Sequence, residues 1–225
     1  MKEQNLKKRI HLHIERIYST SLNETEILEF SDNIYNLIVS KKTLHASPLL
    51  SDQWSEKTTV LITYANSIIS TNNMSPLSSL QKFVSSKCQQ FIDTVHILPF
   101  FPSSSDDGFA VKDYYNVDDE FGDWKDIINI SKSFRVMADV VINHGSSEGV
   151  WFKNFIKGEG RGHDYFLSFD NTFDITEVVR PRTSPLLNTF DTHDGTRYLW
   201  CTFSKDQVDY NFNNPKVINE FVEII

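Results

Sequence analysis

The sequence predicts an α/β fold with parallel strands, and the order of its apolar segments carries this prediction. Apolar strands are expected at 58–65, 95–101 and 136–142, with helices between them at 75–88 and 123–133. A doubly wound sheet would give the same alternation. The second and third strands lead into Asp, Asn and His residues, which is typical of the active-site rim of a β/α barrel. We therefore predict an incomplete TIM (β/α)8 barrel that contains the first three strands.

The N-terminal region is predicted to be helical. Apolar residues recur at helical spacing in two runs within residues 4–40, the first run ending at Ile17. Asn23 followed by Glu26 forms a plausible capping box for the second helix. A polar stretch follows, so residues 1–57 are predicted to be an N-terminal helical arm and linker.

The alternation of strand and helix ends after residue 144. The following stretch is rich in Gly, Asp, Thr and Phe and holds only short strand-like pieces. We predict an insertion after the third strand, and then a helix at 214–225. The organisation is therefore a first part of the barrel at 58–144, an insertion at 145–210 and the start of the next barrel helix at 211–225.

Composition limits the class of protein. The net charge is −8, which argues against nucleic acid as a partner. Two cysteines without metal-ligand spacing suit reduced thiols. The first sixteen residues contain no apolar signal region, and no apolar run is long enough to cross a membrane. A cytoplasmic protein with no membrane partner is expected.

Polar residues with binding chemistry follow the second and third strands. Asp106 and Phe109 flank a glycine just past the second strand, where barrel enzymes place their sites. Asp139, Asn143 and His144 form a D-x-x-x-N-H pattern at the end of the third. A carboxylate can bind sugar hydroxyls and an aromatic ring can stack on a pyranose. A solvated turn and a strand cap are the plainer alternatives. Asp139, in the middle of the predicted strand, should be buried and needs a partner.

These residues resemble the α-amylase superfamily, glycoside hydrolase family 13, and in particular its sucrose phosphorylase branch. The stretches that carry the resemblance are PFFPSSSDDGFAVKDYYNV, VMADVVINH, the Arg-Pro-Arg at 180–182 and GTRYLWCTFSKDQVDYNF. The later stretches look most like the glucosylglycerate and sucrose-6-phosphate phosphorylases of that branch. The resemblance covers about residues 50–225 and identifies the insertion as the family's domain B.

The resemblance also implies roles for individual residues. Asp106 would grip the glucosyl unit, Phe109 would stack on it, and His144 would donate a hydrogen bond to one of its hydroxyls. Arg182 would bind the phosphate acceptor. Asp139 and Asn143 would give structural support, the former to an Arg on the fourth strand.

The family's catalytic carboxylates are not in this sequence. The nucleophile belongs to an R-x-D-A pattern, which the chain lacks, so nucleophile and acid/base are expected beyond Ile225. The resemblance therefore implies the N-terminal part of a retaining α-glucoside phosphorylase, inactive alone. The full-length reaction would transfer glucose from sucrose, sucrose 6-phosphate or glucosylglycerate to inorganic phosphate. No cofactor is expected, and a complementing C-terminal chain is an expected partner.

Three alternatives remain open at this stage. A family 13 α-glucosidase or transglucosidase would share most of the same residues but would not need a phosphate-binding Arg182. A non-enzymatic sugar-binding or interaction protein could reuse half a barrel. A calcium site built on Asn143, as in many amylases, could draw on acidic residues of the insertion. The resembled branch generally lacks that site, so no metal is predicted. The acidic residues in question are Asp164, Asp170, Asp174 and Asp209.

Three parallel strands leave two open edges. We expect 60–64 and 136–142 to be these edges, because sequential strands usually neighbour one another. The inner face should expose apolar side chains and favour association with another chain. The residues expected on that face are Leu61, Ile97, Leu98, Val140 and Val141.

Overall fold

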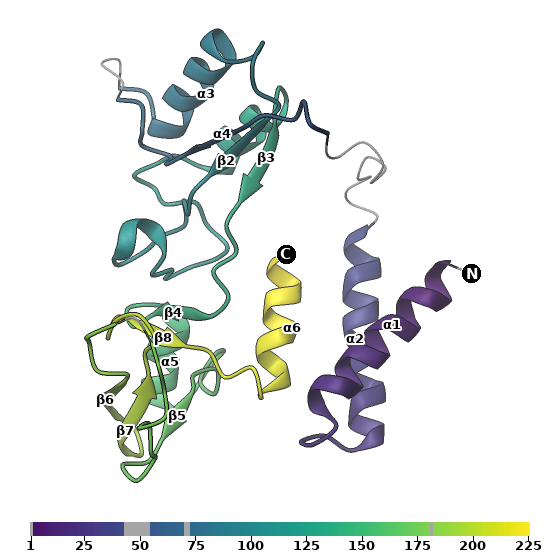
Figure 1. Cartoon of the computed structure of the whole chain (residues 1–225), viewed down its shortest axis with the longest axis vertical. Coiled ribbons are helices and arrows are strands. Elements are labelled where there is room, and N and C mark those ends of the chain that lie inside the picture. The colour runs from purple at the N-terminus through teal and green to yellow at the C-terminus, as the bar shows by residue number, and fades with distance from the viewer. Residues whose placement is uncertain (1, 43–54, 70–72, 181) are drawn as a thin grey trace. The chain divides into compact units, whose positions relative to one another are not determined.

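A computed structural model describes residues 2–42, 55–69, 73–180 and 182–225 of the chain (Figure 1). The chain forms two compact units. One contains the N-terminal residues up to 52 together with 211–225, and the other contains residues 53–210. Each unit is described by itself.

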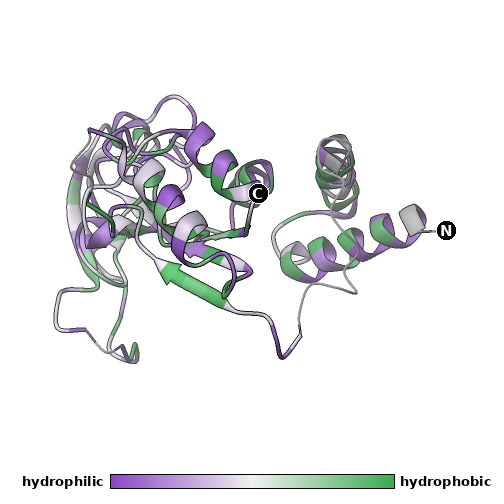
Figure 2. Ribbon diagram, turned by 90° about the horizontal axis from the view of Figure 1, so that it is seen from above, coloured by the Kyte–Doolittle hydropathy of each residue, from purple (hydrophilic) through white to green (hydrophobic). Residues whose placement is uncertain are grey.

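Among its described residues the first unit has three helices, two of them from the predicted arm. The helix that begins at the N-terminus carries alternating hydrophobic and hydrophilic stripes in Figure 2. The capping box is confirmed, since the Glu26 carboxylate accepts from the Asn23 N–H at 2.8 Å and the Asn23 side chain accepts from the Glu26 N–H at 3.0 Å. In the part of the chain that is described, no helix is long and apolar enough to span a membrane. The helices are α1 (Lys2–Tyr18), α2 (Glu24–Lys42) and α6 (Pro215–Ile224).

The core of this unit joins residues from both ends of the chain. Tyr18 is almost fully buried, and its hydroxyl donates to the Phe212 carbonyl at 2.8 Å. Ile218 of α6 packs against the cluster formed by Ile14, Tyr18 and Ile27. The segment that the sequence separates from the arm therefore shares a core with it. Ile17, expected on the apolar face, is instead half exposed.

The second unit begins with a parallel sheet in the predicted strand order. The strands run β1-β2-β3, so β1 and β3 are its edges, as expected. Two helices pack against one another beside the sheet (Figure 1). The strands are shorter than predicted, and the third ends before Asp139 rather than running through it. The elements are β1 (Val60–Thr63), α3 (Pro76–Lys87), β2 (Thr94–Ile97), α4 (Trp124–Ser131) and β3 (Arg135–Ala138).

One carboxylate joins the N-termini of the two helices. Asp123 caps α4 and forms a capping box with Asp126. The Asp126 side chain also accepts hydrogen bonds from the hydroxyls of Ser75, the N-cap of α3, and Ser78. The ends of α3 and α4 are thus fixed relative to each other.

The two faces of the sheet differ in burial. Val95 and Ile97 lie on one face of β2 and are fully buried. Ile62 lies on the opposite face, because side chains alternate along a strand, and is 61% exposed. Of the residues predicted on an exposed apolar face, Val140 is 49% exposed, whereas Ile97 and Val141 are buried, so the prediction is wrong for these two. The exposed Ile62 was not assigned to that face.

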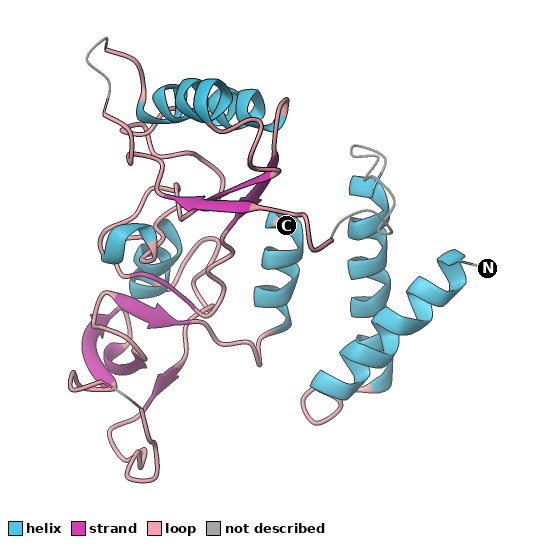
Figure 3. Ribbon diagram, turned by 45° about the horizontal axis from the view of Figure 1, so that its top comes forward, coloured by secondary structure: helices cyan, strands magenta, loops and turns pink. Residues whose placement is uncertain are grey.

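The described residues between 144 and 210 form two small antiparallel sheets and one helix (Figure 3). The helix was not predicted, because its short sequence lies between Gly149 and Gly158. Gly158 ends it in the left-handed conformation, with φ of 72°. The first sheet pairs β4 (His144–Ser146) with β8 (Gln207–Asp209), and the second has the order β5-β7-β6. The remaining elements are α5 (Val150–Lys157), β5 (Ser168–Phe169), β6 (Leu187–Thr192) and β7 (Gly195–Trp200).

Aromatic rings fill the interior of this segment. Phe152 of α5 contacts the rings of Phe166 and Phe190 edge to face, with centroids 5.1 and 5.0 Å away. The Phe166 ring also contacts Phe155 and Tyr210. Edge-to-face pairs add to the free energy gained by burial. The segment therefore encloses a hydrophobic core of its own.

Candidate functional site

The turn that carries Asp106 is the first part of the candidate site. Asp106, Asp107 and Gly108 form one turn of 3-10 helix, with φ of 57°, 50° and 102°. Aspartate tolerates this left-handed region better than most residues. A Cβ on Gly108 would lie 2.5 Å from the Pro99 carbonyl oxygen, so only glycine fits. We call residues 104–109 the Asp106 turn.

Gln207 connects this turn to His144. Its buried side-chain amide donates to the Asp106 carboxylate at 2.8 Å and lies 3.2 Å from His144 Nε2. The Ser204 hydroxyl donates to its carbonyl oxygen at 3.0 Å, which fixes the orientation of the amide. Antiparallel pairing of β4 and β8 brings Gln207 beside Ser146, two residues from His144. Asp106 and His144, which the sequence analysis paired only by role, are therefore brought together.

His144 is buried and neutral. It is 4% exposed, and its Nε2 lies 3.0 Å from the Phe109 carbonyl oxygen. Burial lowers the pKa of His144 below 6.5, although the bond to Phe109 and the charges of Asp209 and Asp106 oppose this. The bond to the carbonyl assigns the proton to Nε2, so Nδ1 is an acceptor, and the nearby Gln207 amide nitrogen contacts Nε2 without a hydrogen bond to it. Nδ1 is itself buried and has no hydrogen-bond partner in the described part of the chain.

Phe203 places Arg182 near His144. The Phe203 ring lies 5.0 Å from the His144 ring, and the Arg182 guanidinium lies 5.4 Å from the centre of the same phenyl ring. The exposed Arg182 can therefore reach an anion beside this group. Arg180 differs, because it donates to the backbone carbonyls of Thr202 and Ser184. Pro181 lies outside the described residues.

The two supporting residues lie apart from this group. Asp139 is partly exposed and contacts His96, with Oδ2 to Nε2 at 3.0 Å. The expected burial is wrong, because Asp139 follows β3 instead of lying within it, and the expected need for a partner is met by His96 on β2. Asn143 is exposed, and its backbone carbonyl accepts from the Tyr210 N–H at 3.0 Å. Phe109 contributes its carbonyl to His144, while stacking by its half-buried ring stays a prediction.

The calcium alternative finds no donor set in the described residues. No group of three or more His, Cys, Asp or Glu side chains could hold a metal ion there. Asp170 and Asp174 accept hydrogen bonds from the nearby Thr172 and Thr176 instead. Asp209 accepts from Thr202 at 2.8 Å, and burial raises the pKa of its carboxyl.

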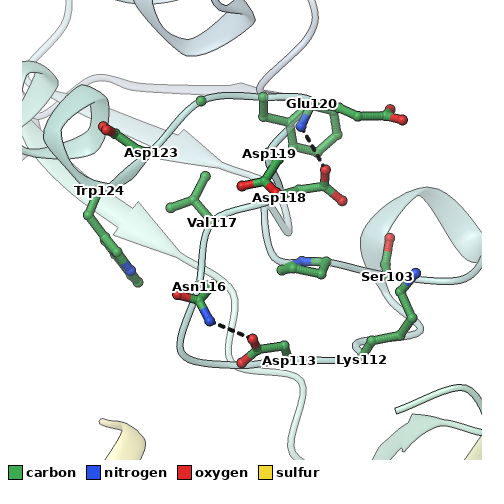
Figure 4. A pocket seen from close by; sticks show the side chains of 13 residues that line it. Ser103, Lys112, Asp113, Asn116, Val117, Asp118, Asp119, Glu120, Asp123 and Trp124 are labelled. Carbon is green, nitrogen blue, oxygen red and sulfur yellow. Dashed lines mark hydrogen bonds between the residues drawn. The ribbon is translucent and has the colours of Figure 1, made fainter. Parts of the chain in front are cut away.

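Two hollows lie near the sheet. One, of 320 Å³, adjoins the ends of β1 and β2 and is lined by Tyr64, Asn66 and Asp107 among others. The other, of 660 Å³, is rich in carboxylates (Figure 4). Its Asp113 accepts from the Asn116 amide at 2.7 Å and its Asp118 from the Glu120 N–H at 2.9 Å. These carboxylates stabilise turns, and none is a predicted site residue.

Comparison with known proteins shows which protein family the chain belongs to. The α-amylase catalytic-domain family model matches residues 90–225, and the chain belongs to this family. A solved structure of sucrose 6F-phosphate phosphorylase from Thermoanaerobacter thermosaccharolyticum is similar over 80% of this chain and 39% of its own, with a TM-score of 0.67 and 28% identity. A mutant of trehalulose synthase MutB shares the fold over 75% of this chain and 32% of its own, with a TM-score of 0.64 and 24% identity.

Several curated relatives of this chain are phosphorylases. The glucosylglycerate phosphorylase of Allomeiothermus silvanus is 42% identical over 76% of this chain and 31% of its own length. That of Escherichia coli is 36% identical over 98% of this chain and 38% of its own. The sucrose phosphorylase of Streptococcus mutans is 32% identical over 67% of this chain and 33% of its own. The chain thus spans about a third of the length of these relatives.

Sequence reasoning missed part of this site. Gln207 was noted only as matching the end of the insertion, and Phe203 and Asp206 were given no role. Their contacts join residues far apart in sequence, as between His144 and Gln207, which are 63 residues apart. The sequence signal that could have pointed to Asp206 and Gln207 is that these polar residues lie just before and at the start of β8, the strand that pairs with β4 beside His144.

Proposed function

We propose that this chain is the glucosyl-binding N-terminal part of a retaining α-glucoside phosphorylase. The observation that carries the proposal is the position of Gln207, which donates a hydrogen bond to Asp106 and packs against His144, so that these two residues lie close together. It places an accessible carboxylate beside a buried imidazole whose Nδ1 is an acceptor without a partner among the described residues. Such a pair can hold sugar hydroxyls in one orientation. The similarity to phosphorylases over most of the chain supports the same conclusion.

The fold supports a finer proposal about the barrel. The sheet β1-β2-β3 would be the first three strands of a TIM barrel, and residues 145–210 would be its domain B. The Asp106 turn and His144 both follow sheet strands, on the side where barrel enzymes bind substrate. A C-terminal partner, whether a separate chain or a continuation, would supply the remaining strands.

The proposed reaction divides between this chain and the rest of the barrel. A carboxylate supplied from elsewhere attacks the anomeric carbon, the leaving oxygen takes a proton, and phosphate oxygen then displaces the carboxylate to give α-glucose 1-phosphate. Asp106 accepts hydrogen bonds from glucosyl hydroxyls, and Nδ1 of neutral His144 accepts another, in place of the donor role expected from the resemblance, because the Nε2 proton is bonded to the Phe109 carbonyl. Arg182 binds the incoming phosphate through its guanidinium.

The relatives favour glucosylglycerate as the glucosyl donor. Glucosylglycerate phosphorylases are 36–42% identical to this chain, and the sucrose phosphorylases are 30–32% identical. Since a cytoplasmic location suits phosphorolysis with inorganic phosphate, we propose that location as well.

A chimaera tests the proposal. These 225 residues are fused to the part of the Escherichia coli relative that follows the matched segment, and release of glucose 1-phosphate from glucosylglycerate and phosphate is measured. The 225 residues alone should give no product. Asp106→Asn and His144→Gln should each lower kcat/KM at least about a hundredfold, roughly 2.7 kcal/mol.

Asp107→Asn is the matched control, since this neighbouring exposed carboxylate does not contact Gln207 in the structure. Its kcat/KM should stay within about threefold of the parent chimaera. Equal losses at Asp106 and Asp107 would reject the assignment of the glucosyl pocket.

A hydrolase or transglucosidase is the second candidate, and Arg182 separates the two. Arg182→Ala should raise KM for phosphate and leave hydrolysis of the glucoside in place. Equal loss of phosphorolysis and hydrolysis would mean that Arg182 has a structural role only.

A further inference from the structure

Asp206 is a partly buried carboxylate surrounded by serine hydroxyls. Its Oδ2 accepts from Ser104 and Ser105, each at 2.5 Å. Its Oδ1 accepts from Ser147 at 2.8 Å and from Ser146 at 3.3 Å. One side chain thus joins two segments that lie about 40 residues apart in sequence.

Each of these bonds lies next to a residue of the candidate site. Ser104 and Ser105 directly precede Asp106, and Ser146 is two residues after His144. Asp206 itself directly precedes Gln207. Its backbone carbonyl also accepts from the Ser147 N–H at 2.8 Å, so the backbone and the side chain both hold β4.

The charge on Asp206 is stabilised by hydroxyls. Burial opposes its ionisation, but hydrogen bonds from the four serines outweigh burial and lower the pKa of this carboxyl. An ionised carboxylate offers about four lone-pair sites, which matches the four donors. An asparagine of the same shape has one acceptor oxygen and brings two N–H donors, so it cannot satisfy the same hydroxyls.

We propose that Asp206 is a positioning residue that fastens the Asp106 turn to β4, so that Gln207 contacts Asp106 and His144 together. Its effect on substrate binding rests on the proposed function, whereas its effect on the turn does not. Asp206 touches no reacting atom. It acts through Gln207 and the Asp106 turn.

The first test needs no substrate. Amide hydrogen exchange is measured in the 225-residue chain carrying Asp206→Asn. We expect amides of residues 103–109 and 144–147 to exchange about tenfold faster or more, with β6 and β7 unchanged. Asp194→Asn is the matched control, because Asp194 also accepts several side-chain bonds but in the turn between β6 and β7. Unchanged protection at 103–109 would overturn the proposal.

The second test uses the active chimaera. Asp206→Asn should raise KM for the glucoside about tenfold and change kcat less. The reason is that a misplaced pocket weakens binding of the substrate ground state and of the transition state alike. Ser105→Ala should give a smaller rise, and Ser105→Thr, which keeps the hydroxyl, should restore the parent value. A fall in kcat with unchanged KM would indicate loss of folded protein and reject the positioning role.

The two tests separate the two proposals. An inactive chimaera contradicts the proposed function, while the exchange result still decides the role of Asp206. Faster exchange with unchanged KM in an active chimaera would show that the Asp106 turn is held by Asp206 but does not bind the glucoside.

Discussion

The parallel sheet β1-β2-β3 and the segment 144–210 belong to one unit but bury their apolar residues differently. The sheet has helices α3 and α4 beside it, and Ile62 on its other face is 61% exposed. The second segment encloses Phe152 and Phe166, each almost fully buried, within its own loops and strands. The sheet is therefore covered on one face only, whereas the aromatic segment buries its rings within its own residues.

The two regions therefore differ in whether their own residues are enough to bury their apolar surface. A sheet with one uncovered face and two open edges can bury more surface only against further chain. The aromatic segment gains its burial from residues that are all present. The candidate site lies where the two regions meet, since Asp106 follows the sheet while His144 and Gln207 belong to the other region.

The largest expected effect is removal of an aromatic ring from the closed region. Phe166→Ala should destabilise the 53–210 unit by about 3–5 kcal/mol, because it deletes a ring packed against Phe152, Phe155 and Tyr210. Denaturant unfolding followed by tryptophan fluorescence measures this loss. Phe173→Ala is the control, since Phe173 is 42% exposed. A similar cost at both positions would mean that the aromatic core is not closed.

An intermediate effect on the free energy of unfolding is expected at His144, where the two regions meet, and this effect depends on pH. Because burial lowers the pKa of His144, the unfolded chain takes up a proton near pH 6.5 that the folded chain does not. The stability that neutral His144 contributes to the folded chain is fully present above about pH 6.5. It is lost as the pH falls below this value, by at most about 1.4 kcal/mol per pH unit.

His144→Gln should flatten this part of the stability curve, measured by urea unfolding between pH 7 and 5. Asp206 does not interfere, because its lowered pKa affects stability only below its unfolded value of 3.8. An unchanged slope in the variant would contradict the burial of a neutral His144.

The smallest effect on stability is expected on the open face of the sheet. Ile62→Ser should change the free energy of unfolding by less than about 0.5 kcal/mol, because the side chain is mostly exposed. The same change should reduce self-association in light scattering, since it removes apolar surface from that face. A large loss of stability would show that this face is covered and would end the contrast between the two regions.

Much of the fold follows from local sequence. The alternation of apolar segments predicted three parallel strands and their order, and Asn23 with Glu26 predicted a cap that the structure confirms. Helix α5 was missed because glycines on both sides made a helical stretch look like a loop. The end of the third strand was misplaced because hydrophobic residues continue past Ala138 without continuing the ladder.

The sequence by itself determined the family, the order of the three parallel strands and the presence of Asp106, His144 and Arg182, because these depend on short patterns and on periodicity. Only the tertiary structure decided that Gln207 joins Asp106 to His144, that Phe203 lies beside both His144 and Arg182, and that Asp206 gathers four serines. The physical reason is distance along the chain. Hydrogen bonds and ring contacts depend on which segments fold together, and a pairing such as β4 with β8 leaves no local pattern in sequence.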